Sequence, residues 1–102
     1  MTTLIGILRQ IRGKESHDSS DVELLIETED GVVDVEFPRT FSPIEREKIL
    51  GKEVEYVHAY RESVPDRYGV YTRTHEYELQ LIADPRLHFQ VICMDVHNPH
   101  GA

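Results

Sequence analysis

The sequence predicts a mainly β protein: a small antiparallel barrel of five to six strands, with one short α-helix between the third and fourth strands. Two observations lead to this prediction. Apolar side chains recur with a period of two along most segments, which is typical of half-buried strands. A single helix-start signature lies near the middle of the chain, between the third and fourth of these segments. A chain of 102 residues has the size that forms one hydrophobic core, so we expect one domain.

The first three predicted strands lie in the N-terminal part of the chain. In the first strand, Ile5 and Ile7 flank Gly6, a residue that permits the close approach of another backbone. The second strand places on one side Val22, Leu24 and Ile26, and the third does the same with Val33, Val35 and Phe37. Between them, Asp30 and Gly31 can take the positive φ angles of a tight turn. We therefore predict a hairpin from these two strands.

The predicted helix follows the third strand. Ser42 can cap a free amide, and Pro43 suits the first helical position. Glu45 completes a capping box with Ser42. Gly51 suits a left-handed C-terminal cap, which would end the helix after Leu50. We expect about two turns, with three apolar residues available to cover the sheet: Ile44, Ile49 and Leu50.

Three further strands are predicted in the C-terminal half. The fourth strand carries on one side Val54, Tyr56, His58 and Tyr60, and the fifth carries His75, Tyr77, Leu79 and Leu81. Residues 62–70 between them are rich in loop-forming types, and Asp84-Pro85-Arg86 marks a turn before a last strand over residues 87–96. We expect residues 1–97 to form the domain and residues 98–102 to form a flexible tail.

The order of these elements resembles that of the oligonucleotide/oligosaccharide-binding fold (OB-fold), a five-stranded Greek-key barrel with a helix between its third and fourth strands. Three features carry the resemblance: Gly6, the turn at Glu29-Asp30-Gly31, and the stretch from Gly51 to Val54 that leaves the helix. It covers most of residues 2–83 and points to no specific family. An SH3-like barrel or an antiparallel α+β sheet would give nearly the same pattern.

The resemblance implies a ligand lying across the second and third strands and the loops beside them. Here these strands carry acidic residues on their polar side: Glu23, Glu27, Asp34 and Glu36. Carboxylates repel the phosphates of a nucleic acid, so this face of the predicted barrel suits such a ligand poorly.

Charge and composition restrict the function further. Nineteen acidic residues against eleven basic ones give a net charge of -8, which weakens any general affinity for nucleic acids or anionic membranes. No apolar run approaches the ~18 residues that span a bilayer, and the N-terminal segment lacks the features of a targeting signal. The single cysteine, Cys93, cannot form an internal disulfide. We therefore expect a cytoplasmic protein.

The segment of residues 52–75 carries equal numbers of basic and acidic residues, whereas the segments before and after it are acidic. Within this segment arginines alternate with tyrosines. The candidate nucleic-acid-binding residues are Tyr60, Arg61, Arg67, Tyr68, Tyr71 and Arg73. Arginines in such a segment can contact phosphates while tyrosines stack on bases. The commoner alternative is that the tyrosines anchor a long loop while the arginines pair with nearby carboxylates such as Glu62 and Asp66.

We predict neither a metal site nor another cofactor. Cys93, Asp95 and His97 are ligand types for zinc or nickel and would share one side of a strand. His100, however, lies beyond Pro99 in the predicted tail. No second cluster completes a tetrahedral set, so a semi-buried thiol and a solvated terminus explain these residues.

We also expect no enzymatic activity. His58 and His75 share a strand side with tyrosines and aliphatic residues, which favours hydrogen-bonded histidines in or beside the core. Cys93 lies between Ile92 and Met94, as expected of a small apolar packing residue rather than a nucleophile. The sequence contains no phosphate-binding glycine loop, nucleophile elbow or metalloprotease helix motif.

Two functions remain from the sequence. The first is a small acidic, non-catalytic binding module that mediates protein–protein interaction, with another protein or a second copy of the chain as its partner. The second is binding of single-stranded nucleic acid through residues 60–73. We favour the first because the acidic balance opposes contact with phosphates. Neither function involves a membrane.

Overall fold

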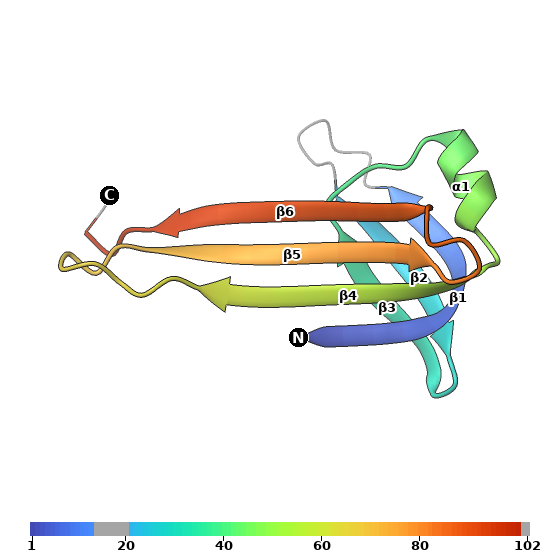
Figure 1. Cartoon of the computed structure of the whole chain (residues 1–102), viewed down its shortest axis with the longest axis horizontal. Coiled ribbons are helices and arrows are strands. Elements are labelled where there is room, and N and C mark those ends of the chain that lie inside the picture. The colour runs from blue at the N-terminus through green and yellow to red at the C-terminus, as the bar shows by residue number, and fades with distance from the viewer. Residues whose placement is uncertain (14–20, 101–102) are drawn as a thin grey trace.

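The computed structural model describes residues 1–13 and 21–100 and places them in one six-stranded antiparallel sheet and one short helix. The strands are β1 (Thr2–Gly13), β2 (Val22–Thr28), β3 (Gly31–Phe37), β4 (Glu53–Glu62), β5 (Tyr71–Leu81) and β6 (His88–His97), and the helix α1 (Pro43–Ile49) lies between β3 and β4. The strand order in the sheet is β3-β2-β1-β4-β5-β6 (Figure 1). The predicted mainly β class, the antiparallel pairing and the position of the helix are confirmed.

The sheet is curled but does not close into a barrel. β3 and β6 form its two edges, whereas a closed barrel has no edges because its first and last strands pair. The strand lengths explain the difference. β2 and β3 have seven residues each, while β4, β5 and β6 have 10, 11 and 10, so the short strands cover only one end of the long ones. The sheet therefore resembles a barrel only at the end that holds the core.

β1 is the strand that folds the sheet over. Its first half pairs with β4 and its second half pairs with β2, and a register shift between Leu8 and Gln10 marks a β-bulge in the second half. At Gly6 the backbone of β2 comes so close that a Cβ atom would lie 2.2 Å from the carbonyl oxygen of Glu27. The expected close approach at Gly6 is confirmed, and only glycine fits there.

The core lies between the two layers of the folded sheet. β2 and β3 form the predicted hairpin, with Gly31 at φ +126°, and this hairpin lies across one face of β4 and β5, which we call the inner face (Figure 1). Phe37 at the end of β3 contacts the ring of Tyr77 on β5, at 6.3 Å between centroids. The buried apolar residues are Leu8, Ile11, Val22, Leu24, Ile26, Phe37, Phe41, Ile49, Val54, Tyr56, Leu79 and Leu81.

The helix α1 covers the end of the core beside the bend of β1. The predicted capping box is present: the Glu45 amide donates to Ser42 Oγ at 3.2 Å, and the Ser42 amide donates to the Glu45 carboxylate at 2.9 Å. Gly51 takes the expected left-handed conformation, with φ +74°. Of the apolar residues on this helix, Ile49 is buried in the core, whereas Ile44 is 67% exposed.

The molecule is elongated because β4, β5 and β6 continue past the core as a single layer. Its principal dimensions are 48 × 30 × 27 Å, and the three strands run side by side to the left of Figure 1, where the loop of residues 63–70 joins β4 to β5. We call this uncovered part of the three strands the distal half. Pro99 packs beside Gly69 in that loop. Of the predicted tail, residues 101–102 lie outside the described part of the chain.

Candidate functional site

The inner face of the sheet continues from the core onto the distal half. Side chains alternate between the two faces of a strand, and the registers of β4, β5 and β6 therefore define which residues share this face. Beyond the core they are His58, Tyr60, Glu62, Tyr71, Arg73, His75, Tyr77, Val91, Cys93, Asp95 and His97. The opposite face, which we call the outer face, carries among others Arg61, Glu76, Ile92, Met94 and Val96. The sequence thus places most of the distal aromatic and histidine rings on one side.

A stack of rings begins where the core ends. The His58 ring lies parallel to the Tyr77 ring, with centroids 4.4 Å apart, and its Nε2 lies 2.9 Å from Nδ1 of His75. Tyr60 contacts the His75 ring in turn, at 4.7 Å between centroids. Burial, followed by the nearby His75, lowers the pKa of His58. The expectation of hydrogen-bonded histidines beside the core is therefore confirmed for both residues.

A second group of rings lies further along the inner face. Nη2 of Arg73 donates to the Tyr71 hydroxyl at 2.8 Å, and the His97 ring lies 4.9 Å from the Tyr71 ring. Nε of Arg73 is buried and has no hydrogen-bond partner among the described residues. Arg73 also pairs in register with Asp95 across the β5–β6 ladder. Arg73 thus lies on a face where its register partners on both neighbouring strands, Glu62 and Asp95, are acidic.

The six candidate nucleic-acid-binding residues are divided among three places. Tyr60, Tyr71 and Arg73 share the inner face. Arg61 lies on the outer face, where it forms an ion pair with Glu76 at 3.2 Å. The last two, Arg67 and Tyr68, lie in the β4–β5 loop, where the guanidinium group stacks on the ring at 4.9 Å. The structure therefore brings together only half of the predicted set.

A pocket lies where the inner face meets the hairpin of β2 and β3. It has a volume of about 380 Å³, and its lining residues include Leu4, Val35, Tyr56, His58 and Tyr77. The Tyr56 hydroxyl donates to the carbonyl oxygen of Glu36 at 2.9 Å, which ties β4 to the edge strand β3. Burial raises the pKa of Tyr56 to about 12, so this hydroxyl stays protonated as a donor.

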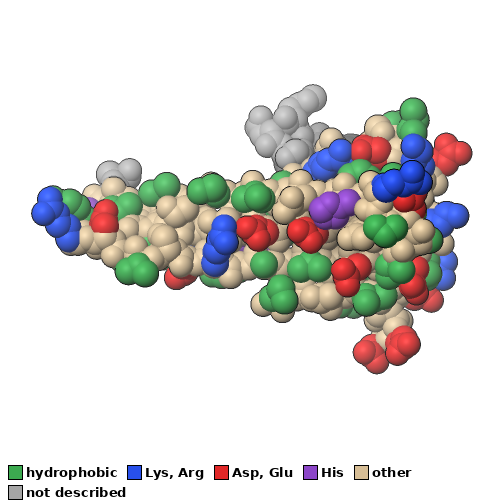
Figure 2. Space-filling view, viewed as in Figure 1, with side chains coloured by type: hydrophobic (Ala, Val, Ile, Leu, Met, Phe, Trp, Pro, Cys, Tyr) green, Lys and Arg blue, Asp and Glu red, His purple; other side chains and the backbone are tan. Residues whose placement is uncertain are grey.

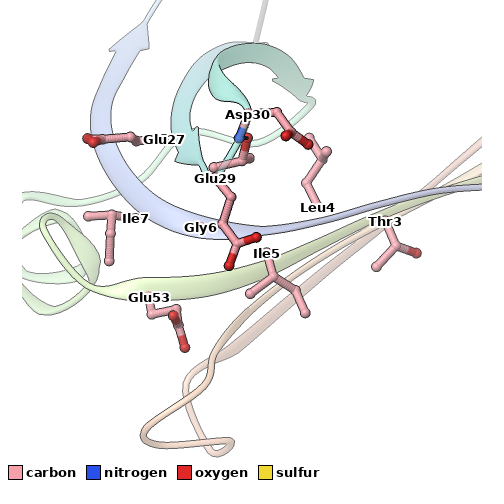
Figure 3. A pocket seen from close by; sticks show the side chains of 10 residues that line it. Thr3, Leu4, Ile5, Gly6, Ile7, Glu27, Glu29, Asp30 and Glu53 are labelled. Atoms are coloured by element: carbon pink, nitrogen blue, oxygen red, sulfur yellow. Dashed lines mark hydrogen bonds between the residues drawn. The ribbon is translucent and has the colours of Figure 1, made fainter.

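A larger pocket lies at the bend of β1, around Gly6 (Figure 3). It measures about 670 Å³ and has four carboxylates in its lining: Glu27, Glu29, Asp30 and Glu53. Glu27 is engaged by Arg9 at 2.6 Å. Within the described residues, no group of three histidine, cysteine, aspartate or glutamate side chains is placed to hold a metal ion.

The predicted placement of Cys93, Asp95 and His97 on one side of a strand is confirmed, since all three lie on the inner face of β6. The Cys93 thiol is free and half-buried, and it pairs in register with His75. His100 is exposed beyond the strand, and its amide donates to the Asn98 side chain at 3.0 Å.

Sheet edges are a possible contact surface for a binding module, but the sequence did not indicate which strand forms one; the structure shows that β6 does. The Leu81 amide donates to the Leu87 carbonyl at 3.0 Å, which fixes the alternation of the β5–β6 ladder. The odd-numbered residues of β6 direct their backbone groups toward β5. The even-numbered residues direct theirs away from the sheet, and β6 is the last strand in the order. Among residues 1–13 and 21–100, no strand pairs with this side of β6, so a row of backbone N–H and C=O groups lies free along it.

The same even-numbered residues carry exposed apolar side chains on the outer face. Ile92 is 54% exposed, Met94 is 71% exposed and Val96 is 65% exposed. Figure 2 shows a row of hydrophobic side chains along the edge that β6 forms in Figure 1. The alternation of these residues is visible in the sequence. The sequence did not predict that these side chains are exposed at an edge, because only the sheet order shows that this strand is an edge.

The other edge, β3, differs in every respect that matters for pairing. It is three residues shorter than β6, and it carries two exposed carboxylates, Asp34 and Glu36. Short length and charge are the means by which proteins protect a sheet edge from pairing with another chain. β6 has an unbroken register with β5 and one acidic residue, Asp95. It lacks that protection.

Comparison with models of protein families, with curated proteins and with solved structures gives no match for this chain. No helix in residues 1–13 and 21–100 is long and apolar enough to cross a membrane. The function is therefore inferred from the geometry of the chain's own surfaces.

Proposed function

We propose that this protein is a small acidic, non-catalytic binding module that mediates protein–protein interaction through the free edge of β6. One observation carries the proposal: the residues whose backbone groups are free at this edge also expose apolar side chains, Ile92, Met94 and Val96. An extended segment of a partner can add to such an edge as a further strand, with main-chain hydrogen bonds for affinity and side-chain contacts for specificity. The net charge of -8 of the whole chain favours solubility while the edge is free.

The proposal is tested by placing charge on the edge. Ile92→Lys combined with Val96→Lys puts two ammonium groups beside the free backbone groups, which opposes strand addition. Val64→Lys is the matched control, because Val64 is 90% exposed but lies in the distal loop. Proteins that bind through β6 are expected to be captured from the native lysate by the wild type and the control but not by the edge variant. Equal capture by all three would refute the proposal.

A second candidate function, binding of single-stranded nucleic acid, is favoured by one observation. Tyr60, Tyr71 and Arg73 share the uncovered inner face with the rings of His75 and His97, and exposed rings of this kind can stack on bases. The charges nearby oppose it. The Tyr60 hydroxyl donates to the Glu62 carboxylate, which raises the pKa of Tyr60 and places a negative charge at the face.

Salt dependence separates this second candidate from the first. Contacts with phosphates predict an affinity for single-stranded DNA or RNA that falls with salt by ~0.7 log units per contact for each decade of concentration. Tyr71→Ala with Arg73→Ala is expected to weaken this binding, whereas Ile92→Lys with Val96→Lys on the outer face is not. Absence of binding by the wild type at low salt would exclude the second candidate.

A further inference from the structure

We propose that the partner of the β6 edge is a second copy of this chain, and that the two β6 strands pair antiparallel about a twofold axis that passes through Met94. The inference rests on the proposed function, since both use the same edge, and it specifies the partner and the register. Three properties of β6 carry it: the direction of its free backbone groups, the pattern of its apolar residues and the position of its one carboxylate.

The free backbone groups restrict the registers that are possible. In a pair of antiparallel β6 strands, the even-numbered residues of each copy have to face one another, because only they direct backbone groups outward. The twofold axis can therefore pass through a residue of β6 but not between two residues. The candidate positions for the axis are the residues at the centre of the strand: Ile92, Cys93, Met94 and Asp95.

The apolar pattern selects one of these registers. With the axis at Met94, this residue lies opposite its own copy, and Ile92 lies opposite Val96 of the second copy. All of the exposed apolar side chains of the edge then meet one another on the outer face. With the axis at Cys93, Val96 would lie opposite Gln90 instead, and one apolar side chain of each copy would remain beside a polar one.

The position of the carboxylate supports the same choice. With the axis at Met94, Asp95 lies opposite Cys93 of the second copy and not opposite another carboxylate. With the axis at Asp95, the two carboxylates would lie directly opposite each other, and like charges in that position destabilise a strand pair. The edge is thus complementary to itself in one register.

The strength of the pairing follows from its size and from the total charge. A single pair of strands forms an interface of the small class, below about 1,200 Å², which is typical of transient complexes. Each copy also carries a net charge of -8, so the two copies repel each other at long range. We therefore expect a dimer that forms at micromolar concentrations or above and that becomes tighter as salt is added. Binding of a nucleic acid would have the opposite salt dependence.

Cysteine cross-linking tests the register. In a paired β6, odd-numbered residues occupy the non-hydrogen-bonded positions, where opposite Cα atoms are about 4.5 Å apart, within the range of a disulfide. Asp95→Cys places its new thiol opposite Cys93 of the second copy if the axis lies at Met94. Peptide mapping distinguishes this link between positions 93 and 95 from the link between two copies of position 95 that an axis at Asp95 would give. In the wild type, Cys93 would link to Cys93 of the second copy only if the axis lay at Cys93. In Val91→Cys, the new thiol would link to Cys93 of the second copy only if the axis lay at Ile92. The three proteins are oxidised with diamide and compared on a non-reducing gel.

We expect a covalent dimer for Asp95→Cys and less than about a tenth as much for the other two proteins, because diagonal Cα atoms are about 7–8 Å apart. A covalent dimer of native Cys93 or of Val91→Cys in excess of that of Asp95→Cys would overturn the register. Met94→Lys provides an independent measurement. It is expected to shift the monomer–dimer equilibrium in sedimentation by more than tenfold, and circular dichroism verifies that this exposed position leaves the fold unchanged.

The failure of this inference is distinguishable from the failure of the proposed function. If the wild type sediments as a monomer up to about 1 mM and Asp95→Cys gives no covalent dimer, the second copy is not the partner. The proposed function would then stand only if other proteins were captured by the wild type and lost with Ile92→Lys and Val96→Lys. If the edge variants kept both self-association and the capture of other proteins, the proposed function and the proposed dimer would both be overturned.

Discussion

At Gly6 the backbones of β1 and β2 approach too closely for any side chain. A Cβ atom there would lie 2.2 Å from the carbonyl oxygen of Glu27 and 2.8 Å from its carbon. Both atoms belong to the backbone, which cannot move without separating the two strands at the bend. A single residue thus permits the fold of the sheet over its own face.

We predict that Gly6→Ala lowers the free energy of unfolding by more than about 2 kcal/mol, in the upper range of overpacking substitutions. Gly13→Ala in the same strand is the matched control, since its Cβ would meet only the end of the Arg46 side chain at 3.8 Å. It is expected to change stability by less than about 1 kcal/mol. Urea denaturation of the two variants measures the difference. Similar stabilities for the two would show that the close approach at Gly6 is not required.

The histidine pair predicts how stability depends on pH. Burial and the nearby His75 lower the pKa of His58 in the folded protein, so the unfolded chain binds more protons in the range below its ordinary value of 6.5. Stability from this residue is complete above about pH 6.5 and is lost as the pH falls from there through the lowered folded-state pKa. We expect the urea midpoint to fall between pH 7.5 and pH 5, and to fall less in His58→Gln.

His100→Gln is the control for this measurement, because His100 is exposed near the end of the described chain. It should show the pH dependence of the wild type. If His58→Gln and the wild type lost stability in parallel on acidification, the dependence would come from other groups.

At the scale of an element, α1 shows that a helix can be defined locally and still depend on the core for its stability. Its seven residues are too few for an isolated helix in water, even with the capping box of Ser42 and Glu45. Burial of one side chain, Ile49, joins it to the core, while Ile44 on the same helix faces solvent. The helix is therefore held to the folded sheet by this buried side chain and by Arg46, whose Nη1 donates to the carbonyl oxygen of Ile11 on β1 at 3.0 Å.

Truncation of the two isoleucines tests this dependence. Ile49→Ala is expected to reduce the free energy of unfolding by about 2–5 kcal/mol, the range found for large-to-small substitutions in cores. Ile44→Ala changes the same residue type on the same helix and is expected to cost less than about 0.5 kcal/mol. Thermal and urea denaturation measure both. A loss for Ile44→Ala equal to that for Ile49→Ala would contradict the orientation of the helix.

At the scale of the whole molecule, the sheet has a two-layered end and a single-layered end. The buried apolar residues of β4 and β5 lie near α1, at Val54, Tyr56, Leu79 and Leu81, while Tyr60 and Arg61 at the other end of β4 are exposed. Regions with few buried apolar contacts open more readily than the core. The distal half, which carries the candidate surfaces, is therefore the less stable part of the sheet.

Hydrogen exchange along β5 measures this gradient. From Arg73 to Gln80, β5 has a neighbouring strand on both sides, and the Thr72 amide donates to Ser63 Oγ at 2.8 Å. Differences in exchange among these amides therefore reflect packing rather than missing hydrogen bonds. We predict that the amides of Thr72 and Arg73 exchange roughly tenfold faster, or more, than those of Leu79 and Gln80. Measurement at low protein concentration avoids the effect of self-association. Uniform protection along β5 would contradict the prediction.

Much of this architecture was readable from the sequence because its causes are local. The alternation of apolar residues, the turn at Asp30 and Gly31, and the capping box at Ser42 each depend on a few neighbouring residues, and the structure confirms all of them. The placement of His58 with Tyr56 and Tyr60 on one side of its strand, and of His75 with Tyr77 on one side of theirs, also followed from strand parity alone.

The closure of the sheet and the identity of its edges were decided only by the tertiary structure. Periodicity describes which side chains share a face of a strand, but it contains no information on which strand is the neighbour. The sequence therefore suggested a barrel, whereas β5 pairs with β6 and leaves both β3 and β6 as edges. For the same reason the candidate set of residues 60–73 is divided between two faces and a loop. Local patterns determined the elements of this protein, and long-range pairing determined which of its surfaces are exposed.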